Sequence, residues 1–308
     1  MADFGQTVII DRREATYVPC PLCHSSEVET LFVRHQFAYQ RCCRCQMVRV
    51  NPQLTAAAIK ALYRKGYESK SRFHAKGPLL IPSQQRRILA KLADIANQRG
   101  RLLDVGCFEG QFLRVAQALG WQVVGTEIST MAASFARETC GLDVRIGALE
   151  TLALPAHSFD AVTFHDVVEH LPQPVHTLAE AARVLPPGGA LYIWTPNFDS
   201  LTRRLILGQQ WGAVIFPWHL CYFTPATLTR AIEQAGFELV SITTRNWLLD
   251  RRDRYLALQN KAGLPPRSPS VLRLHRLLDR ASHPFFAWAS DRGWHLGAQI
   301  GLFARKNR

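Results

Sequence analysis

The chain has 308 residues, a hydrophobic fraction of 47% and a formal net charge of +13. This composition excludes a disordered chain, and the length allows one full core with a small appended module. The N-terminus shows no basic region followed by an apolar core, and no run of about eighteen apolar residues occurs. We therefore expect a cytoplasmic protein.

The positive charge lies at the two ends of the chain. Residues 1–95 hold 15 Lys/Arg against 7 Asp/Glu, and residues 246–308 hold 12 against 4. Residues 96–245 are slightly acidic, with 10 Lys/Arg against 13 Asp/Glu. The basic flanks would suit nucleic acid, an anionic membrane surface or a phosphorylated substrate, and a solvated basic surface explains them equally well.

Two Cys-x-x-Cys pairs stand near the N-terminus. Cys20 and Cys23 are separated from Cys42 and Cys45 by eighteen residues, and the span between them alternates in the manner of a strand. Zinc takes four thiolates tetrahedrally, and the spacing from Cys45 favours Cys42 over Cys43 as the fourth ligand. Disulfides are rare in cytoplasmic proteins, and a redox pair would not need the second knuckle. We predict a structural zinc ribbon.

The segment after the ribbon predicts two helices and a connecting loop. Residues 54–63 form an alanine-rich pattern, and residues 66–82 contain the glycines and prolines of a loop that would cover a ligand as a lid. Residues 83–97 predict a second helix with Ser83 as its N-cap.

A strand, a glycine loop and a helix follow one another from Arg101 onward. Asp104-x-Gly106-x-x-x-Gly110 forms the loop, and the next strand ends on Glu127, twenty-three residues after Asp104. An acid at that place commonly binds ribose hydroxyls. Because the loop lacks the Gly-x-Gly-x-x-Gly of a pyrophosphate site, the pattern favours an adenosine cofactor other than a dinucleotide.

Further strand and helix patterns alternate to the C-terminus, as in a parallel sheet with crossover helices. Phe159-Asp-x-Val, Glu169-His170, Arg183-Val-Leu-x-Pro-Gly-Gly and Thr195-Pro-Asn join the glycine loop as motifs. Together they resemble the small-molecule branch of class I S-adenosylmethionine (SAM) methyltransferases, which includes sugar C-methyltransferases and quinone-type O-methyltransferases.

The resemblance implies an α/β fold with a doubly wound, seven-stranded, mostly parallel sheet. The expected division is a zinc-ribbon module over 1–52, a helical lid or linker over 53–99, and a methyltransferase domain over 100–308. Insertions are expected near 198–224 and 246–295, and the last strand, from residue 296, is expected to run antiparallel.

The resemblance also implies a set of cofactor-binding residues. These are Asp104, Gly106, Cys107, Phe108, Gly110, Glu127, Ile128, Ala148, Leu149 and His165. Two positions depart from the family pattern. Phe108 replaces a glycine, so its backbone is expected to do without a positive φ. Ala148 replaces an aspartate, so the backbone at Ala148 and Leu149 is expected to hold the adenine.

Methyl transfer needs a base that removes a proton from the acceptor, and histidine is the natural supplier. In the family, a His-x-x-Tyr-Phe segment lines the acceptor pocket, which makes His219 with Tyr222 our first choice and His170 the second. Asp166, Glu169 and His170 also resemble the acidic metal-binding segment of quinone O-methyltransferases. A magnesium site there is an alternative.

Three functions remain open from the sequence. The first is a SAM-dependent methyltransferase of EC class 2.1.1 that acts on a small or carrier-linked acceptor of the sugar or phenol type. The second is an rRNA or tRNA base methyltransferase that uses the ribbon and basic flanks for RNA. The third is a non-enzymatic adaptor with this fold. A basic helix at 271–278 would permit peripheral contact with an anionic membrane, and the oligomeric state stays open.

Overall fold

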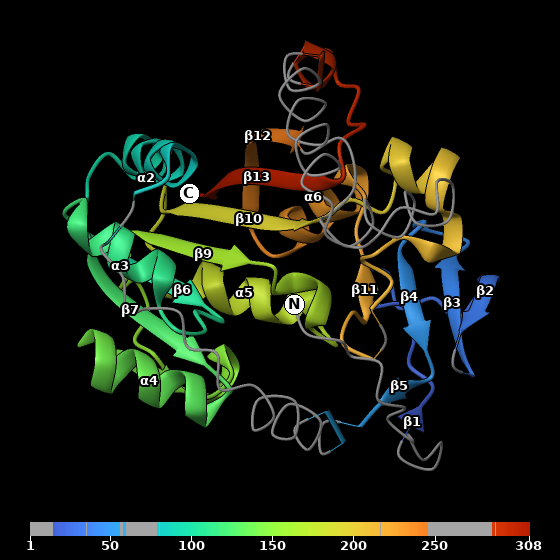
Figure 1. Cartoon of the computed structure of the whole chain (residues 1–308), viewed down its shortest axis with the longest axis horizontal. Coiled ribbons are helices and arrows are strands. Elements are labelled where there is room, and N and C mark those ends of the chain that lie inside the picture. Colours follow the sequence, from blue (N-terminus) through green and yellow to red (C-terminus); the bar gives the residue numbers. More distant parts are fainter. Residues whose placement is uncertain are drawn as a thin grey trace, which may run out of the picture.

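Figure 1 shows the computed structural model of the chain. The structure describes residues 15–34, 36–55, 58–59, 79, 81–215, 217–245, 285–286 and 288–308. Most of the predicted helix at 54–63, most of the loop at 66–82, the helix at 271–278 and most of the insertion at 246–295 lie outside the described residues.

A seven-stranded sheet forms the centre of the fold, in the order β12-β13-β10-β9-β6-β7-β8. The five strands from β10 to β8 run parallel to one another, and β13 is antiparallel to both β10 and β12. The strands are β6 (Arg101–Val105), β7 (Gln122–Glu127), β8 (Val144–Ile146), β9 (Ala161–His165), β10 (Ala190–Pro196), β12 (Phe237–Arg245) and β13 (Gln299–Lys306). The predicted doubly wound, mostly parallel sheet is confirmed.

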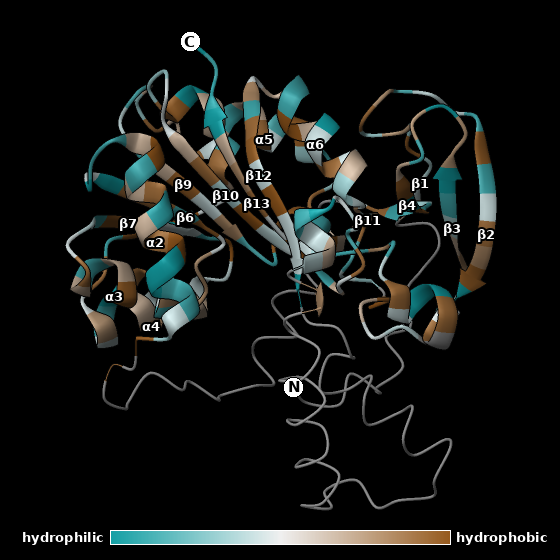
Figure 2. Cartoon of the chain, turned by 90° about the horizontal axis from the view of Figure 1, so that it is seen from above, coloured by the Kyte–Doolittle hydropathy of each residue, from teal (hydrophilic) through white to brown (hydrophobic). Residues whose placement is uncertain are grey.

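Helices cover both faces of this sheet (Figure 2). One face carries α2 (Ser83–Ala96), α3 (Gln111–Ala118) and α4 (Thr130–Cys140), and the other carries α5 (Pro174–Val184) and α6 (Pro225–Gln234). The central strands are continuous buried runs, such as Leu102 to Val105, because a parallel sheet has no solvent-facing side. Pro82 takes the N-cap position of α2, one residue before the predicted Ser83.

A second sheet has the order β11-β4-β3-β2 and contains the ribbon. Its strands are β2 (Val28–Arg34), β3 (Phe37–Cys42), β4 (Val48–Asn51) and β11 (Cys221–Tyr222), and a small pair, β1 (Ala15–Thr16) with β5 (Gln53–Leu54), lies beside them. Because β11 belongs to the predicted insertion at 198–224, the methyltransferase region supplies one strand of the ribbon sheet (Figure 1).

The core of this second unit is shared as well. The ribbon residues Phe37, Tyr39 and Val48 pack in one hydrophobic cluster with Phe198 and Tyr222 from the insertion. Short helices complete the described chain: η2 (Leu149–Thr151), η3 (Val168–His170), η4 (Arg203–Leu207) and η5 (Gly208–Gln210). Among the described residues, no helix combines the length and the apolar character that crossing a bilayer requires.

Candidate functional site

The loop after β6 is built around two buried carboxylates. Asp104 accepts a hydrogen bond from the hydroxyl of Thr163 at 2.6 Å. Glu127 ends β7, and its two oxygens accept hydrogen bonds from the backbone N–H of Phe108 at 2.9 Å and of Ser129 at 2.7 Å. Since β6 and β7 are parallel neighbours, both acids and the glycine loop lie at the carboxyl edge of the sheet.

Three residues of this loop have a left-handed backbone. The φ angles are 69° at Gly106, 51° at Phe108 and 76° at Gly110. The expectation that Phe108 does without a positive φ is therefore wrong. Its hydrogen bond to Glu127 holds a conformation with a modest steric cost for a side chain. At Gly106 a Cβ atom would lie 2.7 Å from Cγ2 of Val167, so the loop passes too close for a side chain.

Burial shifts the titration of both acids. Burial raises the pKa of Asp104 to about 7; the hydrogen bond from Thr163 opposes this rise, and the charge of Glu127 adds to it. Burial also raises the pKa of Glu127, against backbone N–H groups that lower it. A positively charged ligand at this edge would favour the ionised form of both carboxylates.

Exposed apolar side chains lie at the same edge of the sheet as the two carboxylates. The exposed fraction is 41% for Phe108, 49% for Ile128, 38% for Ile146 and 39% for Met131. They follow or end the neighbouring strands β6, β7 and β8, or begin α4. A flat apolar ring is the kind of ligand that covers such a surface. Ile146 and Met131 were missed from the sequence because only the fold reveals their exposure.

Cys107 does not face a ligand through its backbone N–H. That N–H donates to the carbonyl of Thr126 at 3.0 Å, and the N–H of Gly106 donates to the same carbonyl at 2.8 Å. The sulfur fills the space beside Gly125, where a Cβ atom would lie 2.5 Å from it. Cys107 thus supports the loop from inside.

The remaining predicted cofactor residues lie at the ends of β8 and β9. The carbonyl of Ala148 accepts two hydrogen bonds from Thr151, at 3.0 Å from its N–H and at 2.8 Å from its hydroxyl, and Leu149 is buried. The ring of His165 packs against Phe112, with 4.2 Å between ring centroids. Burial lowers the pKa of His165 to about 4, so it is neutral at physiological pH.

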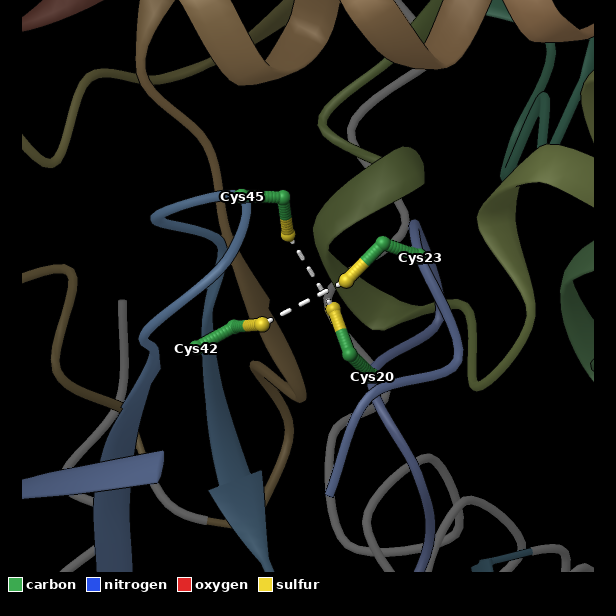
Figure 3. A group of neighbouring side chains, drawn as sticks. All are labelled: Cys20, Cys23, Cys42 and Cys45. Atoms are coloured by element: carbon green, nitrogen blue, oxygen red, sulfur yellow. Dashed lines mark hydrogen bonds between the residues drawn. The ribbon is translucent and has the colours of Figure 1, made fainter. Parts of the chain in front are cut away.

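A second constellation consists of the four predicted zinc ligands. Figure 3 shows Cys20, Cys23, Cys42 and Cys45 converging on a common centre. Their sulfur atoms all lie within 4.8 Å of one another, with 3.3 Å between Cys20 and Cys45 and 3.4 Å between Cys23 and Cys42. A tetrahedral zinc ion with Zn–S bonds of about 2.3 Å would separate its ligands by about 3.8 Å. The donor set and its spacing fit zinc.

The two knuckles share one backbone geometry. In each, the residue four places after the first cysteine has a positive φ, 56° at His24 and 65° at Gln46. Each of these residues donates its N–H to the carbonyl of the first cysteine at 2.9 Å. The repeated turn presents two sulfurs on one side of each knuckle.

The fold distinguishes Cys42 from Cys43. Cys42 is buried in the cluster, whereas Cys43 is exposed. Burial alone would raise the pKa of Cys42, but the backbone N–H groups of Cys45 and Arg44 together with the thiol of Cys23 outweigh it and lower the pKa to about 7. Elsewhere in the cluster, burial raises the pKa of Cys20 and of Cys45.

A third group lies where the turn after β9 meets the insertion. A carboxylate oxygen of Glu169 and one ring nitrogen each of His170 and His219 lie within 4.8 Å of one another. The two histidine rings meet edge to face, with 4.7 Å between centroids. Nδ1 of His170 is 2.7 Å from the carbonyl oxygen of Trp218. Sequence reasoning had named all three residues but had not joined His219 to Glu169.

The ring of Tyr222 packs among aromatic rings of the ribbon and the insertion. Its ring centroid is 6.2 Å from that of His219 and 5.5 Å from those of Tyr39 and Phe198. Burial raises the pKa of Tyr222 well above 10, so the phenol stays protonated. Tyr222 packs in the shared core and is suited to structural support or to hydrogen-bond donation.

The structure gives no support to the magnesium site. Asp166 is exposed and stands outside the group that joins Glu169, His170 and His219 in the described part of the chain. Magnesium prefers an octahedron of oxygen ligands, and a group with two imidazoles and one carboxylate does not provide it.

Comparison with known proteins identifies the family of this chain. A model of the methyltransferase domain family matches residues 81–242, more than half of the chain. The ubiquinone biosynthesis O-methyltransferase of Xanthomonas oryzae pv. oryzae is 29% identical over 181 residues, which cover 55% of this chain and 73% of the relative. A probable S-adenosylmethionine-dependent methyltransferase of Mycolicibacterium smegmatis is 31% identical over 139 residues, covering 45% and 52%.

Solved structures share the fold. A SAM-dependent methyltransferase of Thermotoga maritima, described as a possible histamine N-methyltransferase, superposes with a TM-score of 0.52 at 19% identity, covering 82% of this chain and 100% of its own. A putative sarcosine dimethylglycine methyltransferase of Galdieria sulphuraria gives a TM-score of 0.50 at 15% identity, covering 80% and 98%. The domain match spans α2 to β12, which carry the glycine loop and both carboxylates, and so the chain belongs to the methyltransferase domain family and is a SAM-dependent methyltransferase.

Proposed function

We propose that this chain methylates a hydroxyl group of a small or carrier-linked acceptor of the sugar or phenol type. The match to ubiquinone biosynthesis O-methyltransferases favours oxygen as the methyl acceptor. In this proposal His219 removes the acceptor proton, and the zinc ribbon forms one wall of the acceptor site.

Several features of the carboxyl edge of β6, β7 and β8 support it as the place where SAM binds. When bound, SAM supplies a methyl group on a positively charged sulfur. Glu127, fixed by the N–H groups of Phe108 and Ser129, is placed to accept hydrogen bonds from ribose hydroxyls. Phe108 and Ile128 offer apolar surface to the adenine, and buried Asp104 complements the positive charge. His165 would support this edge as a neutral ring.

Structural zinc would hold the ribbon. Four thiolates that close on one ion leave no open coordination position, so this centre would serve folding and not chemistry. The cluster packs directly on the methyltransferase core, because Cys20, Cys42 and Cys45 share a hydrophobic cluster with strands of the large sheet. Loss of the ion would therefore disturb the insertion as well as the ribbon.

One observation carries the acceptor-site proposal. Leu220, next to His219, links three parts of the fold through its backbone: its N–H donates to the carbonyl of Glu169 at 2.8 Å, and its carbonyl accepts from the N–H of Val50 at 2.9 Å. These bonds hold the backbone at Leu220 between the ribbon strand β4 and the turn that follows β9, and Val167 of that turn lies against Gly106 of the glycine loop. A proton acceptor at this junction suits methyl transfer.

The test is a His219→Asn variant with His176→Asn as its matched control. Asparagine keeps a polar group of similar size without a base, and His176 is an exposed residue of α5. Turnover of methyl-labelled SAM against small-molecule extracts should fall by about a hundredfold or more in His219→Asn only. Affinity for S-adenosylhomocysteine should be unchanged in both variants. Normal turnover in His219→Asn would refute the role of the base.

A further inference from the structure

Glu169 and His219 each carry a buried polar atom that lacks a hydrogen-bond partner. One oxygen of Glu169 accepts from the hydroxyl of Thr195 at 2.9 Å, and the other oxygen, Oε1, has no partner. Nδ1 of His219 has none either. Glu169 is 2% exposed and His219 is 7% exposed, so water does not satisfy these atoms from outside. Buried polar atoms without partners are rare in native proteins, and two in one group point to a shared role.

The backbone fixes these two side chains relative to each other. The residues on either side of His219 are both tied to the turn that carries Glu169. The ring of His170 is bonded to the carbonyl of Trp218, and the N–H of Leu220 donates to the carbonyl of Glu169. These two hydrogen bonds, one on each side of His219, restrict the movement of its backbone away from the carboxylate. The approach within 4.8 Å is therefore a built feature of the fold.

We propose that Glu169 is a positioning residue for His219: its free carboxylate oxygen orients the imidazole and balances the charge that the ring gains when it takes the acceptor proton. The inference rests on the proposed role of His219 as the base. In the active state Glu169 is ionised and His219 is neutral. The proton leaves the acceptor hydroxyl for the ring, and the carboxylate then faces an imidazolium ion. This division of roles resembles that of a catalytic triad, in which a carboxylate orients a histidine and the histidine takes a proton from a third group.

The protonation of the pair follows from its surroundings. Burial raises the pKa of Glu169 well above its ordinary value, and the charge of Asp166 adds to this rise. Burial lowers the pKa of His219, His170 adds to the fall, and the carbonyl of Ala213 opposes it. Burial keeps Tyr222 protonated and raises the pKa of Cys221 to about 12, so both are uncharged, whereas the charge of buried Arg49 on β4 also acts on Cys221.

Because Glu169 and His219 are both buried, the pair is most stable when it holds one proton between the two side chains and carries no net charge. That proton must leave before His219 can act as a base, so the active form appears as pH rises through a pKa that belongs to the pair. Without the carboxylate, His219 would titrate as an isolated buried imidazole, at lower pH. Removing Glu169 should thus lower the apparent pKa of the ring by about one to three pH units.

The test is nitrogen-detected NMR of the labelled histidine rings, bound to S-adenosylhomocysteine, in the full chain. His219→Asn assigns the signal, and Glu169→Gln removes the charge while keeping the acceptor for Thr195. We expect the apparent pKa of His219 to fall by about one to three units in Glu169→Gln and to stay unchanged in the control Glu233→Gln, which changes an exposed residue of α6. Glu169→Asp, which keeps the charge, should restore most of the shift and serves if the glutamine variant does not fold.

Two results would overturn the proposal. One is a His219 titration that is the same with and without the carboxylate. The other is metal analysis that finds a second ion besides that of the cysteine cluster, lost in both Glu169→Gln and His219→Asn, because these residues would then be ligands. The outcomes also separate the two proposals. A full turnover rate in His219→Asn would refute the role of His219 as the base. An inactive His219→Asn variant, together with a His219 titration that is unchanged in Glu169→Gln, would refute only the role of Glu169.

Discussion

Replacing Asp104 by asparagine should stabilise the protein without ligand at pH 8 while weakening its hold on SAM. The folded pKa of Asp104 is about 7, against an ordinary value of 3.8, and burial is the main cause. Because the folded state binds this proton more tightly than the unfolded state, stability falls as pH rises from about 4 to about 7 and does not recover above. About three pH units at about 1.4 kcal/mol each correspond to about 4 kcal/mol at pH 8.

Asparagine cannot ionise, so it removes the loss of stability that the charged Asp104 causes, and it adds a smaller loss of its own. Its oxygen still accepts from Thr163, but its buried amide N–H₂ needs a partner, at about 1–3 kcal/mol. The free energy of unfolding in urea should therefore rise by about 1–3 kcal/mol at pH 8. The advantage should shrink by about 2.5 kcal/mol at pH 5, where most of the wild-type side chain is protonated. A variant that is less stable than wild type at pH 8, or whose difference does not depend on pH, would refute the reasoning.

The remaining predictions concern the zinc ribbon, the glycine loop and RNA. Cys42→Ser should lower metal content from one zinc per chain to well under one and destabilise the fold, while Cys43→Ser should leave zinc in place; equal zinc loss in both variants would contradict the assignment. Gly106→Ala should weaken S-adenosylhomocysteine binding at least tenfold in calorimetry, because its Cβ would meet Val167 at 2.7 Å; full affinity would show that the loop adapts. Filter binding of total RNA should show no affinity that falls steeply with salt, whereas a steep salt dependence would favour the RNA hypothesis.

The sequence predicted the large sheet well because its signals are local. Buried strand runs, glycine turns and helix spacing recur in order, and each needs only neighbouring residues to be recognised. The two zinc knuckles were equally easy to predict, because the spacing of the cysteines determines the turn. These features predict the carboxyl edge of β6 to β8 and the cysteine cluster without knowledge of the full fold.

Long-range pairing explains what the sequence did not reveal. Tyr222 packs in the ribbon core because β11 pairs with β4, and no local pattern reports a contact across some 170 residues. Glu169 was grouped with Asp166 by proximity in the chain, whereas the fold sets it beside His219. Phe108 adopts a positive φ because its N–H bonds to Glu127 on the next strand. In each case a tertiary contact outweighs the local preference.

The central claim is tested most directly by incubating methyl-labelled SAM and a small-molecule extract with the wild-type chain and with His219→Asn. We expect one labelled product of low mass with the wild type, and its formation should be slower by about a hundredfold or more in the variant at equal S-adenosylhomocysteine affinity. Label that enters RNA instead, or a product that forms equally fast with both proteins, would contradict it.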